Sequence, residues 1–273
     1  MSVEPPPDAR GALPGAADKR LLGNVVHGAL ALAAATETWP GSFPRELLLE
    51  AAREQTVKEG VALPGFAQVL ARCAAPYVEV ARRLDAADSP RIVGVEELGV
   101  ARVRDAAGAE RELRFKADRI DEIAGRMRRT DWKTGKPKTV QDHQRGLAQG
   151  ERIQIHAYAQ DGARARYVYL DPEHDDAKRV IDASAIDPGR EKFDQSVATL
   201  FAARDAGAFP PRLRKPDRDE ETVACRSCDL RPACLRGDSG ARMRLAAWAE
   251  AQHDGSELER AALAVWRLPE NGT

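Results

Sequence analysis

The feature that most constrains the fold is the stretch 111–134, in which polar and apolar residues alternate on both sides of the dipeptide Ala124–Gly125. Alternation with a period of two is typical of a half-buried β-strand, and a two-residue connection ending in glycine favours a tight hairpin. The register of that hairpin places Asp118 directly opposite Asp131. Lys133 points to the same face as Asp131, because side chains alternate along a strand.

Two carboxylates and a lysine on one face are the groups that metal-dependent phosphodiester hydrolysis uses. Opposed residues have Cβ atoms about 5 Å apart, so two carboxylates repel each other unless a cation lies between them. A hard divalent ion such as Mg²⁺ or Mn²⁺ would polarise a phosphate there and lower the pKa of a bound water. The alternative is a solvated charged face with no chemistry. The same register pairs Asp121 with Arg128 on the other face, and we interpret that pair as structural.

The remaining periodicity predicts an α/β fold with helices before and after the hairpin. Pro76 lies inside the third predicted helix and should kink or split it. The predicted helices cover 17–35, 43–60, 64–84, 151–160, 190–207, 240–252 and 256–268, and the predicted strands cover 91–105, 111–123, 126–134, 165–171 and 178–184.

These elements divide the chain into five parts. We expect a disordered N-terminus at 1–16, an N-terminal helical part at 17–90, a core at 91–207, a basic loop with a cysteine cluster at 208–240, and C-terminal helices at 241–273. No apolar run has the length of a secretion signal or a membrane span, which predicts a cytoplasmic protein without a membrane partner.

The charge pattern allows only a local nucleic-acid surface. Lys plus Arg (42) and Asp plus Glu (43) give a formal net charge of −1, so no overall field attracts a polyanion. Residues 126–138 nevertheless hold six Lys or Arg against one acid. We predict DNA contacts there and a second basic patch at Arg212, Arg214 and Lys215, whereas Trp132 points away and belongs to the core. The predicted DNA-contacting residues of the first patch are Arg126, Arg128, Arg129, Lys136 and Lys138.

The four cysteines indicate metal or cluster binding in a reducing compartment. Cys225, Cys228 and Cys234 lie close together, where a disulfide would leave one odd thiol. Three thiolates on a short loop can bind a soft metal or an iron–sulfur cluster. Cys73 lies in an apolar helix, where a buried free thiol is the usual state.

Three short motifs resemble the PD-(D/E)XK nuclease superfamily, in particular its RecB/AddB-like exonuclease domains. "ADRIDEI" followed by "DWKTGK" resembles the two strands that carry the family's acids and lysine. "IQIHAYAQ" resembles the QxxxY motif, and Gln154 and Tyr158 lie on one helical face. "GNVVHGAL" resembles the helix that carries the family's histidine ligand, here His27. Phe115 stands where the family pattern has a glycine. This difference affects the expected packing of the local backbone and not the chemistry of the site.

The resemblance implies a restriction-endonuclease-like core with a mixed central sheet flanked by helices. It implies that His27, Asp118, Asp131 and the carbonyl of Trp132 hold Mg²⁺ or Mn²⁺, and that Lys133 serves the attacking water or the transition state. Gln154 and Tyr158 would orient the substrate and the lysine. Glu96 and Glu97 we interpret as surface charges at a strand end; the alternative is a role in the site, because the family often has a Glu at this point.

The resemblance also extends to the cysteines, which have the spacing of a C-terminal iron–sulfur motif. A four-iron four-sulfur cluster would then bind Cys225, Cys228 and Cys234, but the fourth ligand is not identified. Either an upstream segment that carries it is missing, which we favour, or the cluster is absent, incomplete or closed by Cys73.

The function implied is that of a metal-dependent DNA exonuclease. It would process single-stranded ends in recombinational DNA repair, together with a helicase. Two alternatives remain: a catalytically silent nuclease fold that binds DNA as a scaffold subunit of a helicase–nuclease complex, and a zinc-binding regulatory module built on the cysteines.

Overall fold

A computed structural model describes residues 19–36, 38–61, 63–105, 107–210, 234, 238–251 and 255–268. The chain forms two compact units that interleave in the sequence. Unit 1 consists of Met1–Ala101, Arg114–Val140 and Gln154–Ala185, and unit 2 consists of Arg102–Leu113, Gln141–Ile153 and Ile186–Thr273. The part boundaries expected from the sequence stay a prediction.

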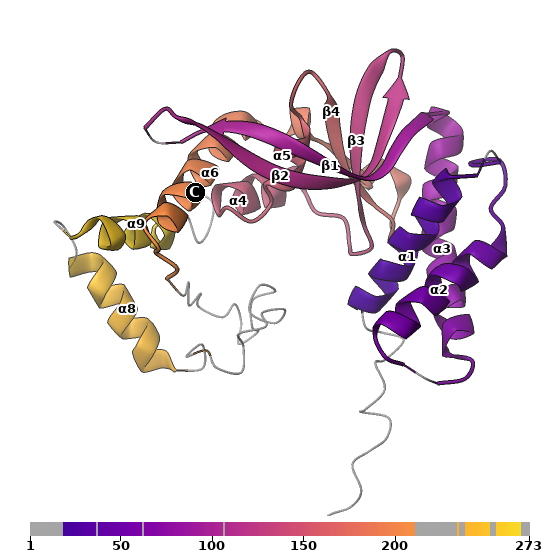
Figure 1. The fold of residues 1–273 in the computed structure, drawn as a ribbon, viewed down its shortest axis with the longest axis horizontal. Helices are drawn as coiled ribbons and strands as arrows, with labels where there is room; N and C mark the ends of the chain where they lie inside the picture. The colour runs from indigo at the N-terminus through magenta and orange to yellow at the C-terminus, as the bar shows by residue number, and fades with distance from the viewer. Residues whose placement is uncertain are drawn as a thin grey trace, which may run out of the picture. The chain divides into compact units, whose positions relative to one another are not determined.

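A five-stranded mixed sheet organises the fold, with the strands neighbouring one another in chain order (Figure 1). β2 pairs antiparallel with β3, β3 pairs parallel with β4, and β4 pairs antiparallel with β5. The predicted mixed sheet flanked by helices is therefore confirmed. The strands are β1 (Arg91–Arg104), β2 (Glu110–Ile123), β3 (Arg126–Lys133), β4 (Arg164–Tyr169) and β5 (Val180–Asp182).

The β2–β3 hairpin has the predicted register. Ala124 and Gly125 both have positive φ, 49° and 74°, as a two-residue hairpin turn of the right twist requires. Arg119 pairs with Thr130 and Asp121 with Arg128. Because a shift of one residue would turn every side chain to the opposite face, this register decides which face receives the acids.

Three helices of unit 1 cover one face of the sheet. They are α1 (Lys19–Ala34), α2 (Arg45–Lys58) and α3 (Phe66–Asp88). Their buried apolar residues form one core with Trp132, Val168 and Leu170 of the sheet region. α3 continues through Pro76 as one helix, so the expected split does not occur. Pro76 is exposed, and the carbonyl that it leaves without a helical donor belongs to the exposed Arg72, where water can replace the bond.

Two short helices connect β3 to β4. The sequence pattern predicts one helix at 151–160, but the structure has α5 (Gln154–Tyr158) in unit 1 and an unpredicted α4 (Val140–Ala148) in unit 2. α4 buries only His143, Gly146 and Leu147, so it lacks the apolar stripe by which helices are recognised in a sequence. Short 3₁₀ turns flank β5 at Asp176–Lys178 and Ala183–Ala185.

Unit 2 has its own small core, formed by Ala203, Ala208, Ala261, Ala262 and Val265. Its longer helices are α6 (Gly189–Asp205), α8 (Ser239–Ala251) and α9 (Glu257–Trp266). α9 begins with a capping box in which Ser256 and Glu259 each bind the backbone N–H of the other. Among the helices that the structure describes, none has the length and apolar character needed to cross a membrane.

Candidate active site

The hairpin brings the first acid into contact with the backbone of the second strand. Asp118 Oδ2 accepts a hydrogen bond of 2.7 Å from the backbone N–H of Trp132, the residue between Asp131 and Lys133. The Trp132 side chain lies in the core on the opposite face, as predicted. This hydrogen bond therefore holds the Asp118 carboxylate against the backbone of β3, between Asp131 and Lys133.

Asp131 and Lys133 form an ion pair on that same face. The Nζ of Lys133 lies 2.6 Å from Asp131 Oδ2, and the Asp131 side chain is buried. Burial raises the pKa of Asp131, as does the neighbouring charge of Asp118, although Lys133 opposes the shift. The net effect is a raised pKa, because the burial of the carboxylate outweighs its pairing with Lys133.

The histidine arrives from α1, a distant segment of the chain. His27 Nδ1 lies 3.3 Å from Asp118 Oδ1. Gly23 is one helical turn earlier, and a Cβ there would lie only 3.2 Å from Thr134 Oγ1, just beyond β3. The missing side chain lets α1 lie close to the end of β3. Burial tends to lower the pKa of His27, but the hydrogen bond and charge of Asp118 outweigh burial and raise it.

Glu96 completes a cluster that the sequence interpretation missed. Ligand atoms of His27, Glu96 and Asp118 all lie within 4.8 Å of one another. Glu96 has φ of 52°, a left-handed conformation that is costly for a non-glycine residue and that changes the direction of a side chain within a strand. Glu96 therefore lies within β1 and not at a strand end as expected, and its carboxylate belongs to the cluster. Two sequence signals pointed to this position: the adjacent pair Glu96–Glu97 breaks the alternation of β1, and the family that the chain resembles often has a Glu at this point.

The donor set of this cluster fits a divalent cation. It offers one imidazole nitrogen and two carboxylate groups, and carboxylate oxygens are the ligands that Mg²⁺ and Mn²⁺ prefer. Oxygens around one Mg²⁺ at about 2.1 Å lie no more than about 4.2 Å apart, so only a small contraction of the cluster would be needed. Asp131 and the carbonyl of Trp132 are candidates for further ligands.

Helix α5 places Gln154 against Lys133 and Tyr158 against Asp131. Gln154 Oε1 accepts a hydrogen bond of 3.3 Å from Lys133 Nζ. The Tyr158 hydroxyl donates to the carbonyl of Lys116 at 2.6 Å and lies 3.3 Å from Asp131 Oδ1. Burial raises the pKa of Tyr158, with a contribution from Asp131, so the hydroxyl stays protonated and able to donate. Both residues of the expected pair thus reach the site.

Two predicted DNA contacts have structural partners instead. Arg129 Nη1 donates to the carbonyls of Tyr158 and Gln160, at 2.6 and 3.3 Å, and so caps the C-terminal end of α5. Arg128 is only 8% exposed and pairs with Asp121 and Asp88. We therefore withdraw Arg128 from the DNA-contacting set. Arg126, Lys136 and Lys138 are exposed, as a phosphate contact requires.

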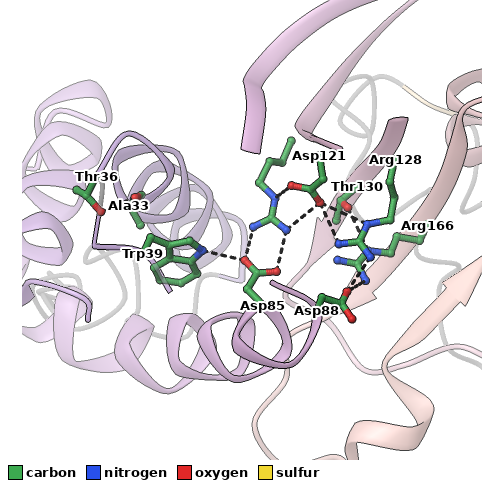
Figure 2. A network of polar contacts seen from close by, with 10 residues as sticks. Ala33, Thr36, Trp39, Asp85, Asp88, Asp121, Arg128, Thr130 and Arg166 are labelled. Atoms are coloured by element: carbon green, nitrogen blue, oxygen red, sulfur yellow. Dashed lines mark hydrogen bonds and ion pairs between the residues drawn. The ribbon is translucent and has the colours of Figure 1, made fainter. Parts of the chain in front are cut away.

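Arg128 belongs to a network of ion pairs behind the site, in which every charged member except the exposed Asp88 is buried (Figure 2). It joins the C-terminal part of α3 to strands β2, β3 and β4. Asp85 binds Arg119 and Trp39, and Asp88 binds Arg128 and Arg166. Burial and the nearby Arg128 lower the pKa of Arg166 to about 10. The network balances three acids, Asp85, Asp88 and Asp121, with three arginines, Arg119, Arg128 and Arg166.

Phe115, which departs from the resemblance, is accommodated by a glycine on the neighbouring strand. A Cβ at Gly99 would lie 2.4 Å from Phe115 Cζ, so the ring occupies the space above that glycine. The Phe115 ring also packs on Tyr158, with centroids 4.9 Å apart. The ring therefore supports the tyrosine that contacts Asp131.

The cysteine cluster and the second basic patch stay predictions. Cys225 and Cys228 lie outside the described residues, as do Arg212, Arg214 and Lys215 of the second basic patch and the N-terminus 1–16. Cys234 is half-buried with a free thiol, and Cys73 is a half-buried free thiol on α3.

A cavity of about 960 Å³ opens beside the cluster, within unit 1. We call it the α1 cavity, because α1 and α2 line much of it. His27, Glu96 and Asp118 line it, as does Lys116. The three candidate ligands His27, Glu96 and Asp118 are therefore open to this cavity.

The sequence was also compared with families of known proteins. The family model of the PD-(D/E)XK nuclease superfamily matches residues 6–235. No curated protein matches the chain. The matched range contains the hairpin acids, the lysine, the histidine and α5. Since the match covers most of the sequence, the chain belongs to the PD-(D/E)XK nuclease superfamily.

Proposed function

We propose that the protein is a metal-dependent DNA exonuclease that processes single-stranded ends in recombinational DNA repair. Its superfamily is one of nucleases that use divalent metals such as Mg²⁺ or Mn²⁺. The observation that carries the proposal is the meeting of His27, Glu96 and Asp118 beside the Lys133–Asp131 ion pair. Three separate segments of the chain contribute to this meeting, which a merely solvated charged face would not require.

The first role in phosphodiester hydrolysis is to bind the metal ion. His27, Glu96, Asp118 and Asp131 would hold the ion, with the carbonyl of Trp132 as a further ligand. A bound Mg²⁺ or Mn²⁺ supplies Lewis-acid polarisation of the phosphate and lowers the pKa of a coordinated water.

The polar groups around the ligands orient the reacting atoms. Lys133 would stabilise the charge that develops on the phosphate, because its ammonium lies on the acidic face of β3. Gln154 holds that ammonium, and the Tyr158 hydroxyl holds Asp131. Such preorganisation removes the need to rearrange charged side chains during the reaction.

The exposed basic residues favour contacts along a DNA backbone over base-specific recognition. Arg126 is exposed at the hairpin turn, and Lys136 and Lys138 are exposed just after β3. Contacts with a phosphate backbone need no base readout. The helicase partner, the iron–sulfur cluster and the cytoplasmic location remain predictions.

The test is degradation of single-stranded DNA by the purified protein with Mg²⁺ or Mn²⁺. Asp131→Asn and Lys133→Met should each reduce the rate by at least about 100-fold, because each removes a charge at the reacting phosphate. Lys178→Met, a matched change at an exposed lysine beyond β4, should leave the rate unchanged. A linear strand should be degraded and a circular strand should resist, since an exonuclease needs an end. Full activity of both site variants would refute the proposal.

The catalytically silent scaffold remains the alternative from a different class. Binding of single-stranded DNA without any cleavage in Mg²⁺ or Mn²⁺ would favour it. The cluster of His27, Glu96 and Asp118 and the ion pair between Lys133 and Asp131 argue against it.

A further inference from the structure

Lys116 is a polar residue of the site to which the resemblance gives no role. It lies on β2 two residues before Asp118, so both side chains point to the same face. Its ammonium forms an ion pair with Glu96, and its side chain is 53% exposed. It also lines the α1 cavity together with His27 and Asp118. A lysine therefore holds one member of the candidate metal cluster.

A divalent cation and the ammonium of Lys116 compete for Glu96. The ligand atom that Glu96 offers lies within 4.8 Å of those of His27 and Asp118, so an ion bound by these three would sit close to the ammonium. Two cations at that separation repel each other. Binding of the ion would thus displace Lys116 from its partner.

The backbone of Lys116 is held while its side chain can move. The Lys116 carbonyl accepts a hydrogen bond of 2.6 Å from the Tyr158 hydroxyl, which fixes the main chain. The ammonium stands at the end of a flexible, half-exposed stem. Lys133 differs, because Asp131 and Gln154 both hold its ammonium. Of Lys116 and Lys133, Lys116 is therefore the one whose ammonium can turn toward a ligand in the α1 cavity.

We propose that Lys116 is a phosphate-binding residue of this site that is held by Glu96 until a divalent ion replaces it. After the ion binds, Glu96 turns to the ion, and the released ammonium contacts a phosphate of the DNA strand in the α1 cavity. DNA binding and metal binding are then coupled through one ion pair. The inference rests on the proposed function for the identity of its ligand.

The first test measures metal affinity without catalysis. Mn²⁺ binding is followed by electron paramagnetic resonance for the wild type, Lys116→Met and Lys116→Arg. We expect Lys116→Met to bind Mn²⁺ about fivefold more tightly, since a half-exposed ion pair contributes up to about 1 kcal/mol. Lys116→Arg, which keeps the charge, and the exposed control Lys178→Met should bind as the wild type does. Equal affinity of Lys116→Met and the wild type would overturn the proposal.

The second test counts phosphate contacts. Binding of a fluorescent single-stranded oligonucleotide is measured at several salt concentrations, once with EDTA and once with Ca²⁺ in place of Mg²⁺. With Ca²⁺ the slope of log K against log salt should be shallower by about 0.7 in Lys116→Met than in the wild type, because one contact is lost. With EDTA the two slopes should agree, since Glu96 then holds the lysine. A difference that is the same in both conditions, or absent in both, would contradict the proposal.

These readouts separate the inference from the proposed function. A wild type that shows both effects but cleaves no DNA would refute the nuclease function and support the coupling. A wild type that cleaves DNA, with Lys116→Met unchanged in both tests, would refute the coupling alone. A wild type that binds no Mn²⁺ would refute the coupling as well. Circular dichroism of each variant checks that the fold is retained.

Discussion

Replacement of Asp85 by Asn tests whether the buried ion-pair network stabilises unit 1. Asp85 is fully buried and accepts hydrogen bonds from both terminal nitrogens of Arg119 and from the Trp39 indole. Arg119 is itself only 3% exposed. The amide of Asn occupies almost the same volume, so the change removes charge without opening a cavity.

The expected cost follows from this geometry. Breaking a buried pair by removing one partner costs about 3–5 kcal/mol, because the other charge stays buried. Asp121 remains 2.8 Å from Arg119 and compensates part of that charge. We therefore expect a loss of about 3 kcal/mol in the free energy of unfolding. For a chain of this size the melting temperature should fall by roughly 6–12 °C.

Urea unfolding measures this loss, followed by circular dichroism and by tryptophan fluorescence. The matched control is Glu79→Gln on the same helix, since Glu79 pairs with Arg82 at 2.7 Å but in an exposed position. That change should cost less than about 1 kcal/mol. The double variant Asp85→Asn/Arg119→Met should recover part of the loss, since it leaves no unpaired charge. Equal losses in the buried and exposed variants would refute the reasoning.

Three further predictions follow from the site and the network. Tyr158→Phe should lower the nuclease rate at least about tenfold, because Asp131 loses its hydroxyl partner, while the unfolding free energy in urea falls by only about 1–2 kcal/mol. Arg126→Gln should make the salt dependence of DNA binding shallower without changing the melting temperature, and Arg128→Gln should do the reverse; the same result for both would contradict the assignment of Arg128 to the network. Burial tends to raise the pKa of Asp88, but Arg128 and Arg166 outweigh burial and lower it below 3.8. The stability that Asp88 contributes is therefore present above pH 3.8 and lost as the pH falls below that value, and Asp88→Asn should show a smaller loss over that range in acid titrations followed by circular dichroism.

Local patterns predicted the part of the site that lies within one hairpin. The two-residue turn and the alternation of side chains determine the register, and the register determines that Asp118, Asp131 and Lys133 share a face. Each of these relations spans fewer than about 20 residues and follows from backbone geometry alone.

The site residues on α1 and α5 could not be predicted from local patterns alone. His27 lies on a helix whose own pattern gives no reason to place it near the hairpin, and Gln154 and Tyr158 share a face of a single short helix. The resemblance supplied these three residues, and the structure brings them to the acids.

Glu96 and Arg128 show where inference from the sequence failed. Glu96 reaches the cluster through a left-handed residue in β1, which alternation does not predict. Arg128 belongs to a basic run, but α3 packs on its face of the sheet and supplies Asp88 as its partner. In both cases the deciding neighbour is distant in the sequence.

The sequence by itself determined the strands, the hairpin register and the face on which the acids and the lysine lie, because these depend on residues a few positions apart. Only the tertiary structure decided which charges complete the site and which are buried behind it. The environment of His27, Glu96 and Arg128 is set by helices packing on the sheet, and the free energy of that packing depends on contacts between segments that no local pattern contains.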